Sequence, residues 1–217
     1  MNKKEKIEKI KKIISILKKD YGNTMLASLS NLDAWKILIA TILSARSKDE
    51  QTEPIAKSLF KRYKNAGQLA NAKKKDVEKI IKKIGFYHQK AKYIIGTSRL
   101  LLKEFNGKVP QTYEQLMSLS GVGRKVAGCV LVYAFGIPAI PIDTHCHRIS
   151  NRLGIVHTKN PEETEKELLR LVPKRYWILV NDILVNHGKK ICTPISPWCS
   201  KCQISSYCPR IGVERSR

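Results

Sequence analysis

Four of the six cysteines lie close together near the end of the chain, at Cys192, Cys199, Cys202 and Cys208. The intervals between them are six, two and five residues. In a reducing compartment such a group favours metal ligation over disulfides, because soft sulfur ligands select zinc or an iron–sulfur cluster. Structural zinc usually takes two short Cys-x2-Cys pairs. This chain has one short pair between wider loops, which suits a cubane larger than a single ion, and zinc remains the alternative.

A second group of residues could bind an anion and attack an electrophile. It consists of Gly121, Val122, Gly123, Arg124 and Lys125, at the start of a predicted helix. Glycines let backbone N–H groups converge, and a helix N-terminus carries partial positive charge, so the motif suits a phosphate. The helix end and Arg124 also favour a neutral, nucleophilic amine on Lys125. A plain helix–helix turn, with Lys125 as one more phosphate contact, is the alternative.

A carboxylate follows eighteen residues after Lys125, at Asp143, in the segment Ile-Asp-Thr-His-Cys-His-Arg. By itself, Asp143 stands where it can cap the helix that follows. His145 and Arg148, later in the same segment, are candidate phosphate contacts or structural partners.

Helices must position these groups. Apolar residues three or four apart predict helices at about 7–17, 35–43, 51–63, 74–83, 88–105, 111–118, 124–135, 143–152, 161–171 and 173–187. Asn31, Leu32 and Asp33 offer a cap before the second of these. The valine-rich run at 126–135 could pass for a strand, but no partner strand is predicted elsewhere. We therefore predict an all-α fold.

The charge of the chain points to a polyanion. Its 217 residues include 41 Lys and Arg against 18 Asp and Glu, a formal net charge of +23, which makes nucleic acid the leading partner. A hydrophobic share of 42% excludes a wholly disordered basic tail. The charged N-terminus has no secretory h-region, and the longest apolar stretch is interrupted by Gly and Pro, so we predict no membrane partner and an intracellular location, cytoplasmic or at the nucleoid.

The cysteine spacing resembles the [4Fe-4S] loop of the endonuclease III family of DNA glycosylases. The glycine motif resembles the helix-hairpin-helix of that family, Leu-Pro-Gly-Val-Gly-Arg-Lys, with Ser120 in place of proline, and the segment around Asp143 resembles its Val-Asp-Thr-His. The resemblance implies that the four clustered cysteines hold a [4Fe-4S] cluster with a mainly structural role. It also implies that the hairpin, Gly121 to Arg124, binds the DNA backbone, that Lys125 forms a Schiff base with the sugar C1′, and that Asp143 assists it.

Two further segments resemble loops that enter the DNA helix in this family. Arg46, in Leu-Ser-Ala-Arg, stands where the family has the glutamine that fills the space left by a flipped base. Arginine can donate to the orphaned base, but the departure puts the usual base preference in question. Phe86, in Gly-Phe-Tyr, corresponds to the stacking residue of the second wedge loop. An ordinary core aromatic is the alternative for Phe86.

The resemblance spans about residues 5 to 209 and implies a two-lobed helix-hairpin-helix DNA glycosylase fold. Residues 24–136 would form a central helical barrel, and residues 1–23 with 137–217 a second lobe carrying the cluster. The implied enzyme is a monomeric, bifunctional DNA glycosylase and abasic-site lyase of base excision repair. It would act on double-stranded DNA with oxidised pyrimidines or abasic sites, and cleave by β-elimination.

Three alternatives remain at this stage. The first is a monofunctional mismatch glycosylase of the same fold, against which Lys125 argues. The second is a non-enzymatic DNA-binding module with a structural zinc ion. The third is a basic RNA-binding protein, for which the sequence offers no aromatic RNA-binding signature.

Overall fold

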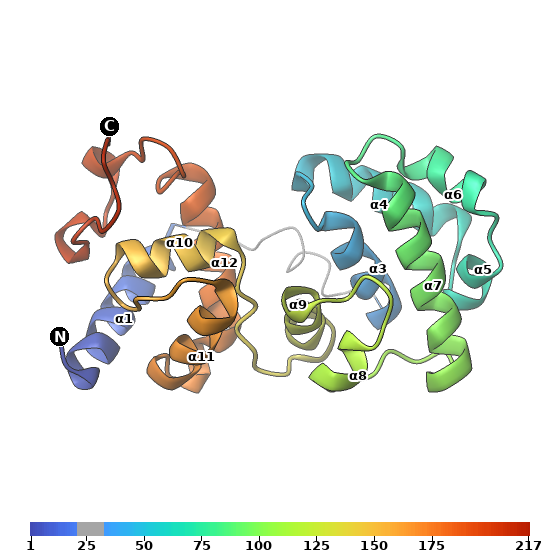
Figure 1. Ribbon diagram of the computed structural model, residues 1–217, viewed down its shortest axis with the longest axis horizontal. Helices are drawn as coiled ribbons and strands as arrows, with labels where there is room; N and C mark the ends of the chain where they lie inside the picture. The colour runs from blue at the N-terminus through green and yellow to red at the C-terminus, as the bar shows by residue number, and fades with distance from the viewer. Residues whose placement is uncertain (21–32) are drawn as a thin grey trace. The chain divides into compact units, whose positions relative to one another are not determined.

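The computed structural model describes residues 1–20 and 33–217, and within these residues the chain forms helices and no strand. Figure 1 shows the path of the chain. The predicted all-α fold class is confirmed. The chain divides into two compact units, one formed by Met25–Ile137 and the other by Met1–Thr24 together with Pro138–Arg217. Within the described part, no helix is long and apolar enough to cross a membrane.

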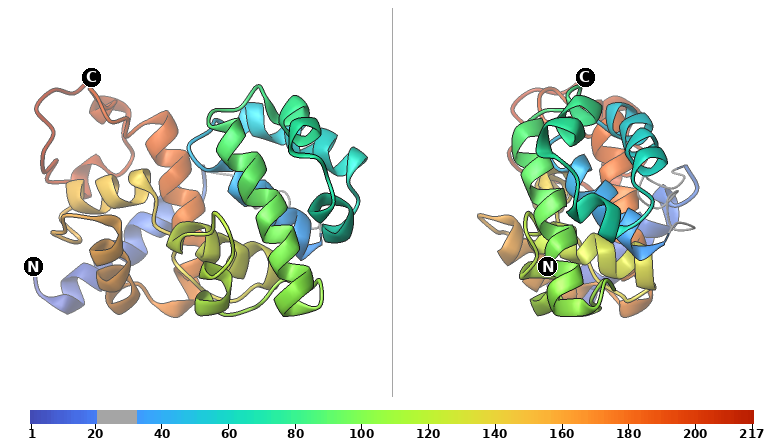
Figure 2. Two further views of the ribbon diagram at one scale, coloured as in Figure 1. Left: turned by 45° about the vertical axis from the view of Figure 1, so that its right-hand side comes forward. Right: turned by 90° about the vertical axis from the view of Figure 1, so that its right-hand side faces the viewer.

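The unit Met25–Ile137 is built around one apolar helix. Its helices are α3 (Ala34–Ser44), α4 (Asp49–Arg62), α5 (Ala66–Ala70), α6 (Lys74–Ile81), α7 (Tyr87–Phe105), α8 (Tyr113–Met117) and α9 (Arg124–Phe135). Every residue of α3 from Ile37 to Leu43 is at most 2% exposed, and α3 packs against α4, α7 and α9. A helix that is apolar on all sides must be central. The long helix α7 can be followed in both views of Figure 2.

The valine-rich run is the helix α9. Eight consecutive residues, Val126–Tyr133, are buried. A helix that is buried on every side has the same continuous apolar sequence as a central strand, so the sequence pattern of this run fits both. The helix ends at Gly136, whose φ of 64° lies in the left-handed region that glycine adopts without strain.

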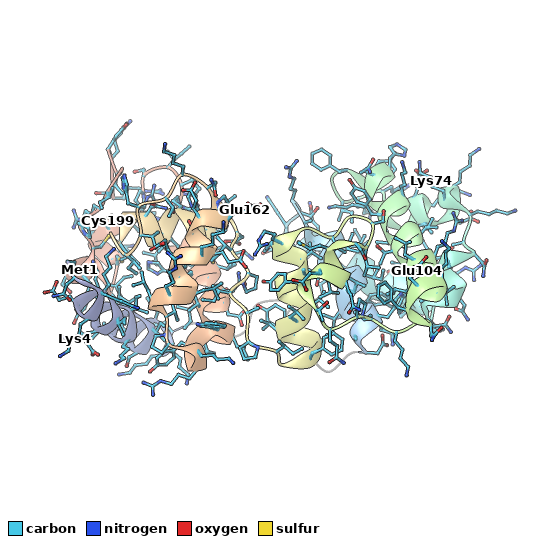
Figure 3. All side chains as sticks on the ribbon, turned by 60° about the horizontal axis from the view of Figure 1, so that its bottom comes forward. Met1, Lys4, Lys74, Glu104, Glu162 and Cys199 are labelled. Carbon is cyan, nitrogen blue, oxygen red and sulfur yellow. The ribbon has the colours of Figure 1, made fainter. Side chains whose placement is uncertain are left out.

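The second unit joins both ends of the chain in one core. Its helices are α1 (Lys3–Leu17), α10 (Thr144–Arg152), α11 (Pro161–Leu171) and α12 (Trp177–Lys190), with short 3-10 turns at Lys174–Tyr176, Cys199–Lys201 and Ser205–Tyr207. The apolar stripe of α1, from Ile10 to Leu17, lies in one hydrophobic cluster with residues of the other three helices. The opposite face of α1 is polar, and Figure 3 shows the labelled Lys4 extending from it.

The positions of the helix ends were predicted less accurately than the presence of the helices. Asp33 is the N-cap of α3, as predicted, and its carboxylate accepts from the Lys36 N–H at 2.9 Å, whereas Asn31 and Leu32 lie outside the described residues. The short helix α5 was not predicted. The single helix predicted at 173–187 is wrong at its start, because residues 174–176 form a 3-10 turn after Pro173 and α12 then runs on to Lys190.

Candidate functional site

The hairpin between α8 and α9 is shaped by contacts with α7. Gly121 has a φ of 77°, and a Cβ built on it would lie 2.5–2.7 Å from side-chain atoms of Tyr93. Both the backbone angle and the space therefore require glycine. The Thr97 hydroxyl donates to the Ser120 carbonyl at 2.6 Å, so α7 also fixes the residue before this glycine. Serine at position 120 thus leaves the hairpin fully formed.

The far side of the hairpin is open. Gly123 is the exposed N-cap of α9, and a Cβ built on it would meet no atom within 4 Å. Arg124 is exposed, with its guanidinium carbon 5.5 Å from the centre of the Tyr113 ring. Lys125 is half-buried in the first helical turn. Backbone, arginine and helix dipole together present positive charge to an anion.

Val122 is turned toward the protein. Its side chain is 7% exposed, and its N–H donates to the Leu119 carbonyl at 3.2 Å. The structure thus gives Val122 an internal role in closing the turn. Its contact with DNA stays a prediction.

Asp143 is the N-cap of α10, in the other unit. Its Oδ1 accepts from the Cys146 N–H at 2.8 Å, which confirms the capping role. This bond fixes the orientation of a half-buried carboxylate at the positive end of a helix.

His145 is held inside the same unit. Its Nδ1 accepts from Arg148 Nη2 at 3.1 Å, and the ring lies against Gly188, where an added Cβ would be 2.4 Å from Nδ1. Burial is the main cause that lowers the pKa of His145. Its contact with DNA stays a prediction.

The four clustered cysteines line one pocket. The pocket has about 410 Å³ of empty space, including space open to solvent. Apolar side chains make up much of the rest of its wall: Ile149, Leu153, Ile191, Pro197, Trp198, Ile204 and Val213. Burial raises the pKa of the Cys202 and Cys208 thiols. Among the described residues, no three His, Cys, Asp or Glu side chains are placed to hold one metal ion.

Nitrogen donors reach the sulfurs. Arg152 Nη1 lies 3.4 Å from Cys192 Sγ, and the Arg210 N–H lies 3.4 Å from Cys208 Sγ. His187 Nε2 is 3.7 Å from Cys202 Sγ. The N–H donors of Arg152 and Arg210 stabilise negative charge on sulfur.

Two arginines that hold the cysteine loop were not predicted in this role. Arg152 is 7% exposed and donates to the carbonyls of Thr193 and Pro194, both at 2.7 Å. Arg148, one turn earlier on α10, donates to the Cys192 carbonyl at 2.7 Å. Their spacing places both on one helix face, but the sequence contains no sign of what that face meets.

Arg46 and Phe86 occupy the tips of adjacent turns. Both have a left-handed backbone, with φ of 54° and 58°, and both side chains are exposed, Phe86 to 64%. A Cβ built on Gly85 would lie 3.9 Å from the Arg46 carbonyl oxygen, so the two turns are neighbours. The exposure of Phe86 excludes the alternative of a core aromatic.

The fold and the hairpin define a helix-hairpin-helix protein of DNA repair. Residues 39–174 match the profile described as HhH-GPD superfamily base excision DNA repair protein. The chain is 46% identical to endonuclease III of Thermotoga maritima over 81% of this chain and 83% of the relative, and 38% identical to that of Synechocystis over 94% and 93%. On this evidence the chain belongs to the endonuclease III family.

Solved structures agree with this assignment. A structure described as a non-covalent endonuclease III–DNA complex has a TM-score of 0.87 and 31% identity, covering 97% of this chain and 96% of the other. A thermostable thymine-DNA glycosylase has a TM-score of 0.81 and 25% identity, covering 96% and 95%. The predicted activity is confirmed at this level: the chain is a bifunctional DNA glycosylase and abasic-site lyase of base excision repair.

Proposed function

We propose that this enzyme removes oxidised pyrimidines from double-stranded DNA, with Lys125 as its nucleophile. The observation that carries the proposal is the position of Lys125, half-buried in the first turn of α9 directly after the open hairpin. A backbone phosphate bound at the N-terminus of this helix would bring a sugar close to the amine. A structure described as a trapped endonuclease III–DNA covalent intermediate, with a TM-score of 0.86 and 30% identity, supports a covalent route.

In the first step the neutral Lys125 Nζ bonds to C1′ while the glycosidic bond breaks, and the base leaves with its electron pair and takes up a proton. The bonded Nζ then loses one proton, the C1′–O4′ bond opens, and O4′ takes up a proton, which gives a protonated imine and a free 4′-hydroxyl. Loss of a C2′ proton and departure of the phosphate oxygen from C3′ with its electron pair complete β-elimination and cut the strand on the 3′ side; water then hydrolyses the imine and releases Lys125. We assign to Asp143 the role of accepting the amine proton and stabilising positive charge on the sugar, for which its fixed carboxylate is suited.

DNA binding is proposed to need no sequence reading. The hairpin residues Gly121 to Arg124 and the net charge of +23 attract phosphates, and Arg46 and Phe86 enter the helix where the damaged base is flipped out. His145 is proposed as a further DNA contact. The working form is proposed to be a monomer at the nucleoid, acting on damaged bases or abasic sites.

The four clustered cysteines fit a [4Fe-4S] cluster. We propose Cys192, Cys199, Cys202 and Cys208 as its ligands, because their thiols line one pocket and N–H donors reach the sulfurs of Cys192 and Cys208. The bound cluster would supply a structural link between the segments of this loop. A zinc ion is the competing occupant, and the two differ simply, because an iron–sulfur protein is brown and a zinc protein is colourless.

Borohydride trapping tests the nucleophile. A duplex with one oxidised pyrimidine is incubated with the protein and borohydride, which reduces the imine to a stable adduct that migrates slowly in a denaturing gel. We expect an adduct with the wild type and with Lys57→Ala, a control at an exposed lysine, and none with Lys125→Ala. An unreactive wild type, or a reactive Lys125→Ala, would overturn the proposal. Base release without strand cleavage would favour a monofunctional glycosylase.

A further inference from the structure

A buried lysine near the start of α7 connects the two turns that carry Arg46 and Phe86. The Lys90 side chain lies in the interior, with the residue 4% exposed, and its Nζ donates to the Ser47 hydroxyl at 2.6 Å. Its backbone N–H donates to the Phe86 carbonyl at 2.9 Å. One residue therefore bonds to the first turn through its side chain and to the second through its main chain.

This arrangement is costly for the folded protein. An ammonium loses hydration on burial, and burial lowers the pKa of Lys90 to about 8. An apolar side chain of similar length would fill the same space at lower cost. The cost therefore points to a task other than stability.

The two turns also need outside support. A left-handed backbone at a residue other than glycine is unfavourable, and it persists only where the surroundings fix it. Both Arg46 and Phe86 have this conformation at the ends of exposed turns. The Ser47 N–H donates to the Ser44 carbonyl at 3.0 Å, which closes the first turn locally, and the bond from Lys90 then anchors that turn to α7.

We infer that Lys90 is a positioning residue that holds the Arg46 turn and the Phe86 turn in one fixed arrangement, so that both exposed side chains enter DNA together. The inference rests on the proposed function, in which these two side chains replace a flipped base. A preformed pair of turns does not lose loop entropy on binding, whereas ordering a flexible loop residue costs free energy. The benefit is confined to paired DNA, because a single strand has no base stack to open.

The test compares paired with unpaired substrate. For Lys90→Met, which keeps the length and removes the donor, we expect kcat/KM on a duplex lesion to fall about tenfold, the equivalent of one hydrogen bond. We expect a fall of less than about threefold on a single strand with an abasic site. Ser47→Ala, which removes the acceptor, should act in the same direction. The fluorescence of a 2-aminopurine placed opposite the lesion should rise less than with the wild type, because the orphaned base stays stacked.

A matched control separates positioning from general loss of structure. Leu101→Ala removes a fully buried side chain farther along the same helix, and a merely destabilising change should lower both activities by the same factor. The inference is overturned if Lys90→Met lowers both activities equally, or leaves their ratio and the fluorescence unchanged. If the wild type forms no borohydride adduct, the proposed function fails instead. Trapping by the wild type with no effect of Lys90→Met defeats only the present inference.

Discussion

The hairpin and the cysteine loop are both irregular segments, but they are fixed in different ways. The hairpin is short, and its shape follows from the backbone freedom of Gly121 and from nearby residues of α7. The cysteine loop makes turns of its own and is also held from outside, by the guanidinium groups of Arg148 and Arg152, which lie about forty residues earlier in the chain. The sequence of each segment identifies its functional residues, but it does not show which distant side chains hold the cysteine loop in place.

The largest effect is expected from alanine at the two hairpin glycines. Gly121 is needed for the shape of the hairpin, whereas Gly123 leaves its outer side open to DNA. Gly121→Ala forces a left-handed alanine into the space of the Tyr93 ring, and we expect a loss of about 4 kcal/mol in unfolding free energy. Gly123→Ala has an ordinary φ of −102° and open space, so stability should fall by no more than about 1 kcal/mol, the usual difference between glycine and alanine at an N-cap. Its Cβ should still weaken binding to undamaged duplex. Urea unfolding measures the stability of the two variants, and titration with DNA measures their binding. Equal stabilities for both variants would contradict the conclusion that Gly121 fixes the shape of the hairpin.

The second largest effect is expected when the arginine contacts that hold the cysteine loop are removed. Arg152→Ala removes the donors of a buried guanidinium to two carbonyls and one sulfur, which we expect to cost about 3 kcal/mol. Amide hydrogen exchange should accelerate at residues 192–199 and remain unchanged in the hairpin. Arg170→Ala, which removes an exposed ion pair on α11, is the control and should alter neither. Unchanged exchange at 192–199 would show that the loop holds its own shape.

A smaller effect follows from Lys90 and depends on pH. Because burial lowers its pKa to about 8 in the folded protein while the unfolded chain keeps the usual 10.5, the unfolded state binds more protons between these values. Stability therefore rises with pH across this window, by about 2 kcal/mol as an order of magnitude. Lys90→Met should lack this rise and be more stable than the wild type at pH 7. Parallel stability curves from pH 7 to 10.5 would contradict the burial of a charged lysine.

The smallest effect is expected at exposed pairs. The Lys57 Nζ lies 2.7 Å from a Glu53 carboxylate oxygen on the outer face of α4, with both side chains well exposed. Glu53→Gln should change unfolding free energy by at most about 0.5 kcal/mol, because water and salt screen such pairs. A thermal melt at low and high salt checks this. A larger loss would mean that this surface pair contributes as much as a buried one.

The helices could be predicted from apolar spacing because each must bury one stripe, and α3 and α9 are the most apolar because they are buried on every side. The short helix α5 escaped prediction, since five residues give too little periodicity to detect. The burial of Lys90 was not predicted, for another reason. A lysine in an amphipathic helix is normally expected at the surface, and only the packing of α7 shows that this one lies inside.

The sequence by itself determined the chemistry that this chain carries: four thiols at fixed intervals, a glycine hairpin before Lys125, and an aspartate that caps a helix. These follow from residue types and short spacings, which act through local bonds. Only the tertiary structure decided what those groups rest on: the arginines of α10 behind the cysteine loop, the face of α7 behind the hairpin, and Lys90 between two strained turns. Such contacts join residues far apart in the chain, and their energies depend on burial, which residue spacing alone does not specify.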